Sequence, residues 1–332
     1  MPGSVTSAFT EAADFEAALR EGGGVGLLVT GPGAFRARLT RIALLSLRLA
    51  SAEEHLPRIL LVAVPPGMIL VALPGAGEPA PVLGGISMGP REIMTLGPGE
   101  RLHMRSHGPY RWGGIWLPAT ELVRYASVMT GTAFTIPCAA PRWRLRPAIS
   151  RQLRQLHSAA IGFVEGRSKA LIEGETAHGL EQQLIEALVT GLAKGSAIAA
   201  APATREHREV AFRFEALLLA EPERVFRTEE ICAALAVSAQ TLHLSCEEQL
   251  GMQPIEYARR RRMQLVHRAL RRGNCETPSI ADLARRYGFR GLGHFAADYR
   301  ALYGELPSAT LRRGLDPAMA DLRLRRARRS TF

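Results

Sequence analysis

The chain has 332 residues, of which 47% are hydrophobic, 22% charged and 6% aromatic. This composition excludes a wholly disordered chain and a collagen-like chain, and the length predicts two or three domains. No apolar run approaches the roughly 18 to 20 residues of a membrane span, and the first residues lack the basic and apolar regions of a secretory signal. We therefore expect a cytoplasmic protein without a membrane partner.

The four cysteines are far apart, and no two of them form a Cys-x-x-Cys pair. This spacing favours reduced, partly buried thiols over a disulfide framework or a zinc site. Cys246 is expected in the core together with Met252 and Met263. The other cysteines are Cys138, Cys232 and Cys275.

The net charge of +11 is concentrated in the C-terminal part of the chain. Residues 205–332 contain 23 arginines, no lysine and 16 acidic residues, which leaves a charge of +7. A basic domain is the electrostatic pattern expected of a protein that binds phosphate groups. Exposed arginine that binds nothing explains the charge equally well, because the chain as a whole contains almost no lysine.

Residues 1–140 predict a β-rich domain. A helix is expected at 9–20, before three consecutive glycines, and another at 121–129. Between them, proline and glycine clusters separate short apolar or alternating runs, which is typical of a small sandwich or barrel. The expected strands are 25–29, 37–49, 58–64, 68–73, 91–96, 100–104 and 112–117.

Two amphipathic helices are expected at 150–165 and 178–194, after an irregular joint at 135–147 that contains three prolines. One face of each helix is apolar. The pair therefore either forms a dimer interface, which we favour, or covers the β-rich domain. Residues 195–204 are mostly small and include a proline, which predicts a linker to the next domain.

From residue 205 onward the pattern is helical and contains one helix-turn-helix unit twice. In the first copy, Thr228 is expected to cap a helix and a tight turn follows at 236–238. Ser238 is expected to cap a second helix that ends at Gly251. The residues expected to face inward are Ile231, Ala234, Leu235, Leu242 and Cys246.

The second copy begins at Ser279, which with Asp282 resembles a capping box, and it turns at 288–289. Its expected inward face comprises Ile280, Leu283, Ala284, Phe295, Tyr299 and Leu302, before a stop at Gly304. Between the copies, residues 255–272 predict one helix that spans roughly 27 Å. Such a rod can hold two reading helices about one DNA turn, roughly 34 Å, apart.

Residues 228–313 resemble the DNA-binding domain of the AraC/XylS transcriptional regulators. The most specific matches are Ile-Ala-Asp-Leu-Ala at 280–284, Tyr-Gly-Phe at 287–289 and Tyr-Gly-Glu-Leu-Pro-Ser at 303–308. The resemblance implies a sequence-specific regulator of transcription, usually an activator that contacts RNA polymerase. It also implies a cupin-like N-terminal domain for effector binding or dimerisation.

These inferences predict an α+β protein in four parts. They are a β-rich cupin-like sensing domain at 1–140, a helical linker or dimerisation segment at 148–200, an all-α AraC-type DNA-binding domain with two helix-turn-helix units at 208–314, and a basic tail at 315–332. The expected partners are double-stranded promoter or operator DNA, RNA polymerase, a small organic effector and a second copy of the chain. The expected location is the cytoplasm, at the nucleoid.

The first unit departs from the family pattern at Gln240, Leu244 and Cys246, where relatives commonly carry basic residues and an inward aromatic residue. Gln240 is suited to pair with adenine, and other polar residues of this helix can hydrogen-bond base edges. A surface that binds nothing is the alternative reading of these exposed groups. The candidate DNA contacts are Gln240, Thr241, His243, Arg259, Arg262, Arg290, Gly291, His294 and Arg300.

The β-rich domain contains the start of a cupin metal motif, in which Gly97 precedes His103. Arg105 stands where the second histidine is expected, so we expect no metal and no other cofactor. Arg105, Tyr110, Trp112 and Trp116 are candidates for a pocket that holds an organic anion. Ordinary packing of a β core is the favoured alternative.

The sequence shows no nucleophile–base pair, phosphate-binding loop or metalloprotease motif, and we expect no enzymatic activity. Two other interpretations stay open. One is a metal-assisted cupin-type enzyme with a DNA-binding appendage, and the other is a basic protein that binds DNA without sequence preference.

Overall fold

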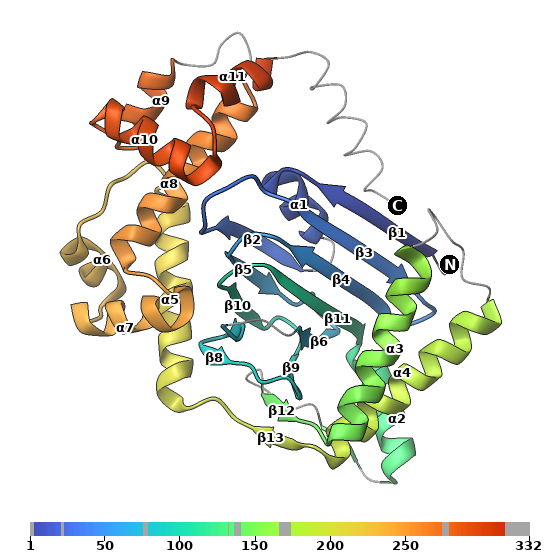
Figure 1. The fold of residues 1–332 in the computed structure, drawn as a ribbon. Helices are drawn as coiled ribbons and strands as arrows, with labels where there is room; N and C mark the ends of the chain where they lie inside the picture. Colours follow the sequence, from blue (N-terminus) through green and yellow to red (C-terminus); the bar gives the residue numbers. More distant parts are fainter. Residues whose placement is uncertain are drawn as a thin grey trace. The chain divides into compact units, whose positions relative to one another are not determined.

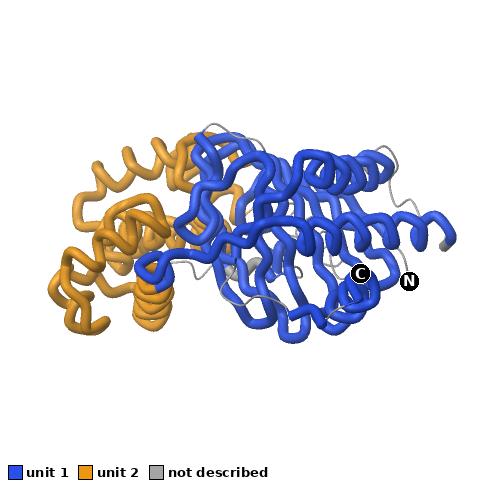
Figure 2. The backbone as a smooth tube through the Cα atoms, turned by 90° about the horizontal axis from the view of Figure 1, so that it is seen from below, with its two compact units in different colours: residues 1–27, 36–205 blue, residues 28–35, 206–332 orange. Residues whose placement is uncertain are grey.

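The computed structural model describes residues 3–20, 23–75, 79–131, 133–135, 141–165, 174–273 and 279–315. The chain divides into two compact units, shown in different colours in Figure 2. Unit 1 comprises residues 1–27 and 36–205, and unit 2 comprises residues 28–35 and 206–332. Cys138, Cys275 and the predicted basic tail beyond residue 315 lie outside the described residues.

Unit 1 is built on two β-sheets (Figure 1), which confirms the predicted strand-rich N-terminal region. Short turns join many of the strands, and the strands of the larger sheet pair antiparallel. The larger sheet has the order β1 (Gly3–Phe9), β3 (Ala37–Ala43), β4 (Arg48–Glu54), β11 (Tyr110–Pro118), β6 (Met68–Pro74), β9 (Glu92–Leu96), β12 (Arg142–Arg144) and β13 (Ser196–Ile198). The smaller sheet has the order β2 (Gly24–Val29), β5 (Arg58–Ala63), β10 (Arg101–Ser106), β7 (Val82–Leu83) and β8 (Ile86–Ser87).

Helices cover one face of the larger sheet. These helices are α2 (Ala119–Thr130), α3 (Pro147–Glu165) and α4 (Gly174–Lys194). A further helix, α1 (Ala12–Leu19), lies between β1 and β2 in the sequence. Leu153 of α3 and Leu184 of α4 share one buried core with sheet residues such as Ile115. The alternative that these amphipathic helices cover the β-rich domain is therefore confirmed. Their use as a dimer interface stays a prediction.

Helix α3 is seated on the larger sheet through a buried histidine. Nε2 of His157 lies 3.0 Å from the carbonyl oxygen of Ala50. The ring fits because Gly113 has no side chain, and a Cβ atom there would lie 2.6 Å from the imidazole. Burial lowers the pKa of His157 to about 4, so this histidine is neutral near pH 7.

The turn between β3 and β4 is held by a carboxylate from a distant helix. The prediction of one strand at 37–49 is wrong, because the chain reverses at Leu44, whose amide donates to the carbonyl of Leu47 at 2.9 Å. Glu181 of α4 accepts from the backbone amides of Ser46 and Leu47, at 2.9 and 3.2 Å, and from the Ser46 hydroxyl at 2.7 Å. No glycine or proline marks this turn, since Glu181 supplies the acceptors that fix it.

Three other boundaries also differ from the predictions. Phe9, predicted to open a helix, ends strand β1 instead. The predicted joint at 135–147 contains β12, and the predicted linker at 195–204 contains β13. These two short strands pair with each other, and β12 pairs with β9. Their pairing partners are remote in sequence, so local composition alone reads them as irregular.

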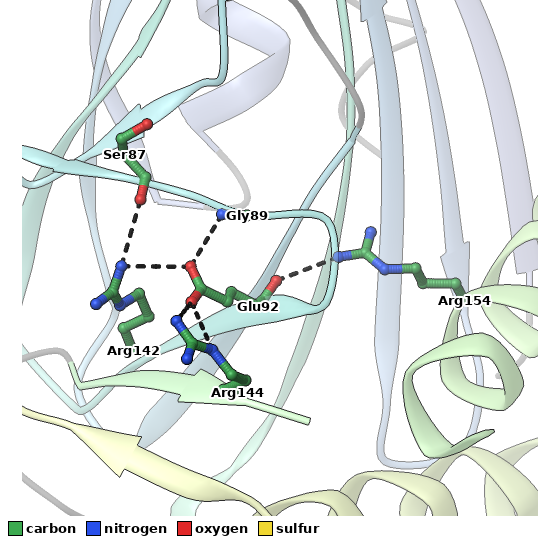
Figure 3. Close-up of polar contacts among 6 residues, drawn as sticks. All are labelled: Ser87, Gly89, Glu92, Arg142, Arg144 and Arg154. Atoms are coloured by element: carbon green, nitrogen blue, oxygen red, sulfur yellow. Dashed lines mark hydrogen bonds and ion pairs between the residues drawn. The ribbon is translucent and has the colours of Figure 1, made fainter. Parts of the chain in front are cut away.

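A cluster around Glu92 of β9 links this strand to β12 and to α3 (Figure 3). The Glu92 carboxylate accepts from the amide of Gly89 at 2.9 Å, from Arg142 at 3.4 Å and from Arg144 at 3.0 Å. Arg154 of α3 donates to the carbonyl oxygen of Glu92 at 3.2 Å. Burial by itself raises the pKa of Glu92, but the Gly89 amide and the two arginines outweigh it, and the pKa lies below its ordinary value.

Unit 2 is helical over its C-terminal part, as predicted. Its helices are α5 (Pro202–Ala220), whose first four residues are assigned to unit 1, α6 (Thr228–Leu235), α7 (Ala239–Leu250), α8 (Pro254–Arg271), α9 (Ile280–Arg286), α10 (Leu292–Tyr303) and α11 (Pro307–Leu315). Within the described parts of both units, no helix combines the length and the apolar character needed to cross a membrane.

Candidate nucleic-acid interface and internal cavity

The first helix-turn-helix consists of α6 and α7. Helix α6 ends at Leu235, and its C-cap Ala236 is a non-glycine residue in the left-handed region with φ 52° and ψ 47°. Ser238 then caps α7, and its hydroxyl accepts from the amide of Thr241 at 3.0 Å. The inward positions Leu242 and Cys246 are fully buried, and burial raises the pKa of the Cys246 thiol to about 12.

Two predictions for the first unit are wrong. Thr228 is the first residue of α6, and the residue before it, Arg227, is the N-cap. The Arg227 amide donates to the Glu230 carboxylate at 2.7 Å, so an acidic side chain one turn into the helix satisfies the helix end. Ala234, predicted to face inward, is exposed, because the buried stripe of this short helix runs through Ile231 and Leu235 alone.

The second helix-turn-helix consists of α9 and α10 and follows the prediction closely. The Ser279 hydroxyl accepts from the amide of Asp282 at 3.1 Å and caps α9. Gly288 makes the turn with φ 81°. Phe295 packs between Phe289 and Tyr299, with ring centroids 5.2 and 5.8 Å away, in a buried aromatic row.

Helix α8 joins the first helix-turn-helix to the second. Arginines of its Arg259–Arg262 run make contacts within the helical domain. Nη1 of Arg262 donates to the carbonyl oxygen of Tyr287 at 3.1 Å, and its guanidinium lies 5.6 Å from the centroid of the Phe289 ring. Burial, followed by the charge of Arg259, lowers the pKa of Arg262. Arg259 forms an ion pair with Asp298 of α10. Both candidate DNA contacts in this run therefore also position the second unit.

A hydrogen-bonded chain holds α10 and α11 against α8. Nδ1 of His267 lies 2.6 Å from the Tyr299 hydroxyl, which donates to Oγ1 of Thr310 at 2.8 Å. The Thr310 hydroxyl donates to the Glu305 carboxylate at 2.5 Å. Burial, with smaller effects of nearby arginines, lowers the pKa of His267 to about 3. Sequence analysis missed this histidine because its partners come from two other helices.

The remaining candidate DNA contacts lie on the outer surfaces of the two helix-turn-helix units. Thr241 is half-buried behind the cap at Ser238. On α7, Leu244 is also exposed, although the sequence identified only polar neighbours as contacts. The exposed candidates are Gln240, His243, Arg290, Gly291, His294 and Arg300.

Charge is distributed unequally between the two helix-turn-helix units. Residues 228–250, which form the first unit, contain four glutamates and neither lysine nor arginine. Residues 279–304, which form the second unit, contain four arginines and two aspartates. Helix α8 adds six arginines and one glutamate. The basic character predicted for the C-terminal part therefore resides in α8 and the second unit.

Unit 1 contains an apolar cavity that opens to solvent, and its empty space, counted together with the solvent-open part, is about 490 Å³. Alternate residues of the central strands divide between two faces: Val71 and Ile115 pack under the helices, while Leu70 and Trp116 line the cavity. The other lining residues are Ala18, Leu19, Leu39, Arg41, Ala50, Leu60, Val62, Ala72, Met104, Trp112, Gly113 and Gly114.

The predicted effector pocket is assembled only in part. Trp112 and Trp116 line the cavity, but Arg105 and Tyr110 do not. Arg105 follows Met104 on β10, so the two side chains point to opposite faces and Met104 takes the cavity side. The Tyr110 ring is covered by the Arg58 guanidinium, 5.5 Å from its centroid.

The two cavity tryptophans differ in their hydrogen bonds. The indole N–H of Trp112 donates to the Glu54 carboxylate at 2.6 Å, and Glu54 is paired with Arg58 at 3.0 Å. The indole nitrogen of Trp116 is buried and has no hydrogen-bond partner among the described residues. Arg41 is the cation of the cavity lining, and it donates to the carbonyl of Ala18 at 3.3 Å. The cavity lining thus combines apolar side chains with one cation.

The histidine of the partial cupin motif is buried inside the sheet. His103 lies on β10 and is 1% exposed. Within the described ranges, no three His, Cys, Asp or Glu side chains are grouped so that they could hold a metal ion.

Comparison with known proteins shows which family the C-terminal part of the chain resembles. Residues 231–313 match the family described as a helix-turn-helix domain. Over 89 residues the chain is 35% identical to the "XylDLEGF operon transcriptional activator 2" of Pseudomonas putida, which covers 27% of this chain and 57% of that protein. Residues 231–313 form an AraC-type helix-turn-helix domain.

Further relatives match the same AraC-type domain. The chain is 32% identical over 88 residues to the "HTH-type transcriptional activator RhaS" of Klebsiella pneumoniae, covering 26% of this chain and 30% of that protein. A crystal structure of a probable AraC family transcriptional regulator from Rhodopseudomonas palustris is 30% identical, with a TM-score of 0.31, and covers 32% of this chain and 99% of that one. The chain spans little more than half, or less, of the curated relatives it matches.

Proposed function

We propose that this protein is a sequence-specific DNA-binding regulator of transcription, an activator that binds promoter DNA through its AraC-type domain. The observation that carries this proposal is the pair of capped helix-turn-helix units, each with an exposed outer surface on its second helix. A second helix in this position is the element that enters the major groove. Arg290, His294 and Arg300 are exposed at the second unit, where they can meet phosphates or base edges.

The proposal includes the partners that such a regulator requires. The protein works in the cytoplasm at the nucleoid, contacts RNA polymerase and acts as a homodimer. It acts by binding and not as an enzyme, in keeping with matched relatives that are named as transcriptional activators. A basic protein without sequence preference is the competing function, because α8 alone carries six arginines.

Selective binding by the full-length protein tests the proposal. Rounds of selection from a randomised DNA duplex pool are expected to enrich one sequence motif, and the selected duplex should bind far more tightly than random DNA at about 0.15 M salt. Arg290→Ala is expected to weaken binding to that duplex about tenfold or more. Arg151→Ala, an exposed arginine on α3 of unit 1, is the matched control and should leave affinity unchanged. Equal affinity of the wild-type protein for selected and random duplexes contradicts the proposal.

We further propose that the cavity of unit 1 binds the small organic effector. The support is an apolar lining that contains one arginine, together with the N–H of Trp116, for which the described part of the chain offers no acceptor. A ligand carboxylate would satisfy that donor and approach Arg41, while the rest of the ligand replaces water against apolar walls.

Substitution of two tryptophans tests this effector site. A panel of small aromatic and aliphatic carboxylic acids is titrated against the full chain, and ligands are detected by a rise in Tm. Trp116→Phe is expected to weaken the affinity of any ligand found about five- to tenfold, because the ring stays but the donor is lost. In the control, Trp143→Phe, the lost N–H donates to Thr95 at 2.9 Å outside the cavity, and affinity should not change. Equal ligand affinities for Trp116→Phe and the wild type would contradict this site.

A further inference from the structure

The outer face of α7 is centred on a leucine. The buried face of this helix carries Leu242, Ser245, Cys246 and Gln249. At 100° per residue, the opposite face runs through Gln240, Leu244 and Glu247. Leu244, at the centre, is 50% exposed. A large apolar side chain therefore occupies the middle of the surface that a second helix of this type turns toward DNA.

The charge of α7 makes it a poor phosphate clamp. Glu247 is the only ionisable group on its central outer stripe, and its carboxylate accepts from the side chain of Gln253 at 3.0 Å. The whole first unit contains four glutamates and no cationic lysine or arginine. Since lysine and arginine supply the salt-dependent attraction to phosphates and acids near phosphates are repelled, this helix adds little electrostatic affinity for the DNA backbone.

The outer face of α7 is therefore suited to uncharged contacts with base edges. The thymine methyl group projects into the major groove and is read by apolar side chains, and glutamine pairs with the adenine edge. Gln240 and Leu244 are four residues apart and thus neighbours on one helix face, with Gln240 in the first turn. They are placed to meet adjacent base pairs.

We propose that Leu244 reads a thymine methyl group, with Gln240 beside it on adenine. The first unit thereby supplies discrimination for A·T base pairs, while α8 and the second unit supply most of the salt-dependent affinity. This inference rests on the proposed function, because it requires the AraC-type domain to bind DNA in a sequence-selective way. A protein partner for the exposed leucine is the competing occupant.

The experiment replaces each thymine of the selected duplex by uracil, one at a time, which removes a single methyl group. For the wild-type protein we expect one or two positions at which this change weakens binding about fourfold. Leu244→Ala should lose about the same factor on the thymine duplex and become insensitive to uracil at those positions. Leu292→Ala, which removes a leucine that is 38% exposed at the start of α10, is the control and should stay sensitive there.

The salt dependence gives a second, independent readout. Leu244→Ala should leave the slope of log affinity against log salt unchanged, whereas Arg290→Ala should reduce it by about 0.9 if one phosphate contact is lost. If Leu244→Ala keeps wild-type affinity and the wild-type response to uracil, the inference is overturned and Leu244 faces a protein. If the wild-type protein enriches no sequence at all, the proposed function fails and this inference fails with it.

Discussion

Replacement of Glu54 by alanine is expected to lower the free energy of unfolding of unit 1 by about 3–5 kcal/mol. The Glu54 carboxylate and the Arg58 guanidinium are both completely buried, and two hydrogen bonds join them, at 3.0 and 3.1 Å. Loss of the carboxylate leaves the arginine charge with the Met104 carbonyl, 2.6 Å away, as its one remaining acceptor among the residues that the structure describes. It also leaves the indole N–H of Trp112 without an acceptor.

Fluorescence-monitored denaturation checks this expectation. All three tryptophans of the chain lie in unit 1, so their emission reports the unfolding of that unit. Glu53→Ala is the matched control, because Glu53 is the preceding residue on β4 and pairs with Arg111 at the surface. The control should change the unfolding free energy by less than about 1 kcal/mol. Equal effects of the two substitutions would show that the buried pair does not stabilise unit 1.

The Gly288→Ala change is expected to destabilise the second helix-turn-helix by about 2–3 kcal/mol. Gly288 has φ 81°, a conformation that L side chains rarely adopt. A Cβ atom there would lie 2.2 Å from Cγ2 of Val225 and 2.7 Å from Nη1 of Arg262. Because Arg262 donates to the adjacent Tyr287 carbonyl, displacement of its guanidinium also loosens the turn.

A second glycine in the same unit supplies a control of opposite sign. Gly293 is the second residue of α10, and no atom of the described residues lies within 4 Å of the position its Cβ would take. Gly293→Ala should therefore stabilise the helix by about 0.5–1 kcal/mol. Circular dichroism at 222 nm during urea unfolding measures both changes in the helical unit. Destabilisation by both substitutions would mean that backbone conformation does not explain the effect at Gly288.

The helix-turn-helix units illustrate how much local sequence specifies. Ser238, Ser279, Gly251 and Gly304 end or begin helices where the sequence predicts them, because a cap involves atoms only a few residues apart. The sequence does not predict Arg227 as the N-cap, because its side chain makes no capping hydrogen bond. The carboxylate of Glu230, within the helix, accepts from the Arg227 amide instead. The sequence marks Leu244 as a departure from the family pattern, but only the burial pattern of α7 places it at the centre of the outer face.

In unit 1, more of the structure depends on contacts between segments that are distant in the sequence. The predicted pocket retained Trp112 and Trp116 and lost Arg105 and Tyr110, because strand faces and the buried Arg58 divide the four residues. The last strands, β12 and β13, exist only through pairing with each other and with β9. Neither residue type nor spacing within such three-residue segments distinguishes a strand from a loop.

The sequence by itself determined the strand-rich and helical regions, the repeated helix-turn-helix, its main caps and its likeness to the AraC-type domain. Periodicity and caps depend on contacts within one or two turns, so the order of residues encodes them directly. Only the tertiary structure decided the β3–β4 turn on Glu181, the cavity lined by Trp112 and Trp116, and the arginines that brace α9 and α10. Each of these depends on groups far apart in the chain, whose approach is set by the packing of the whole unit.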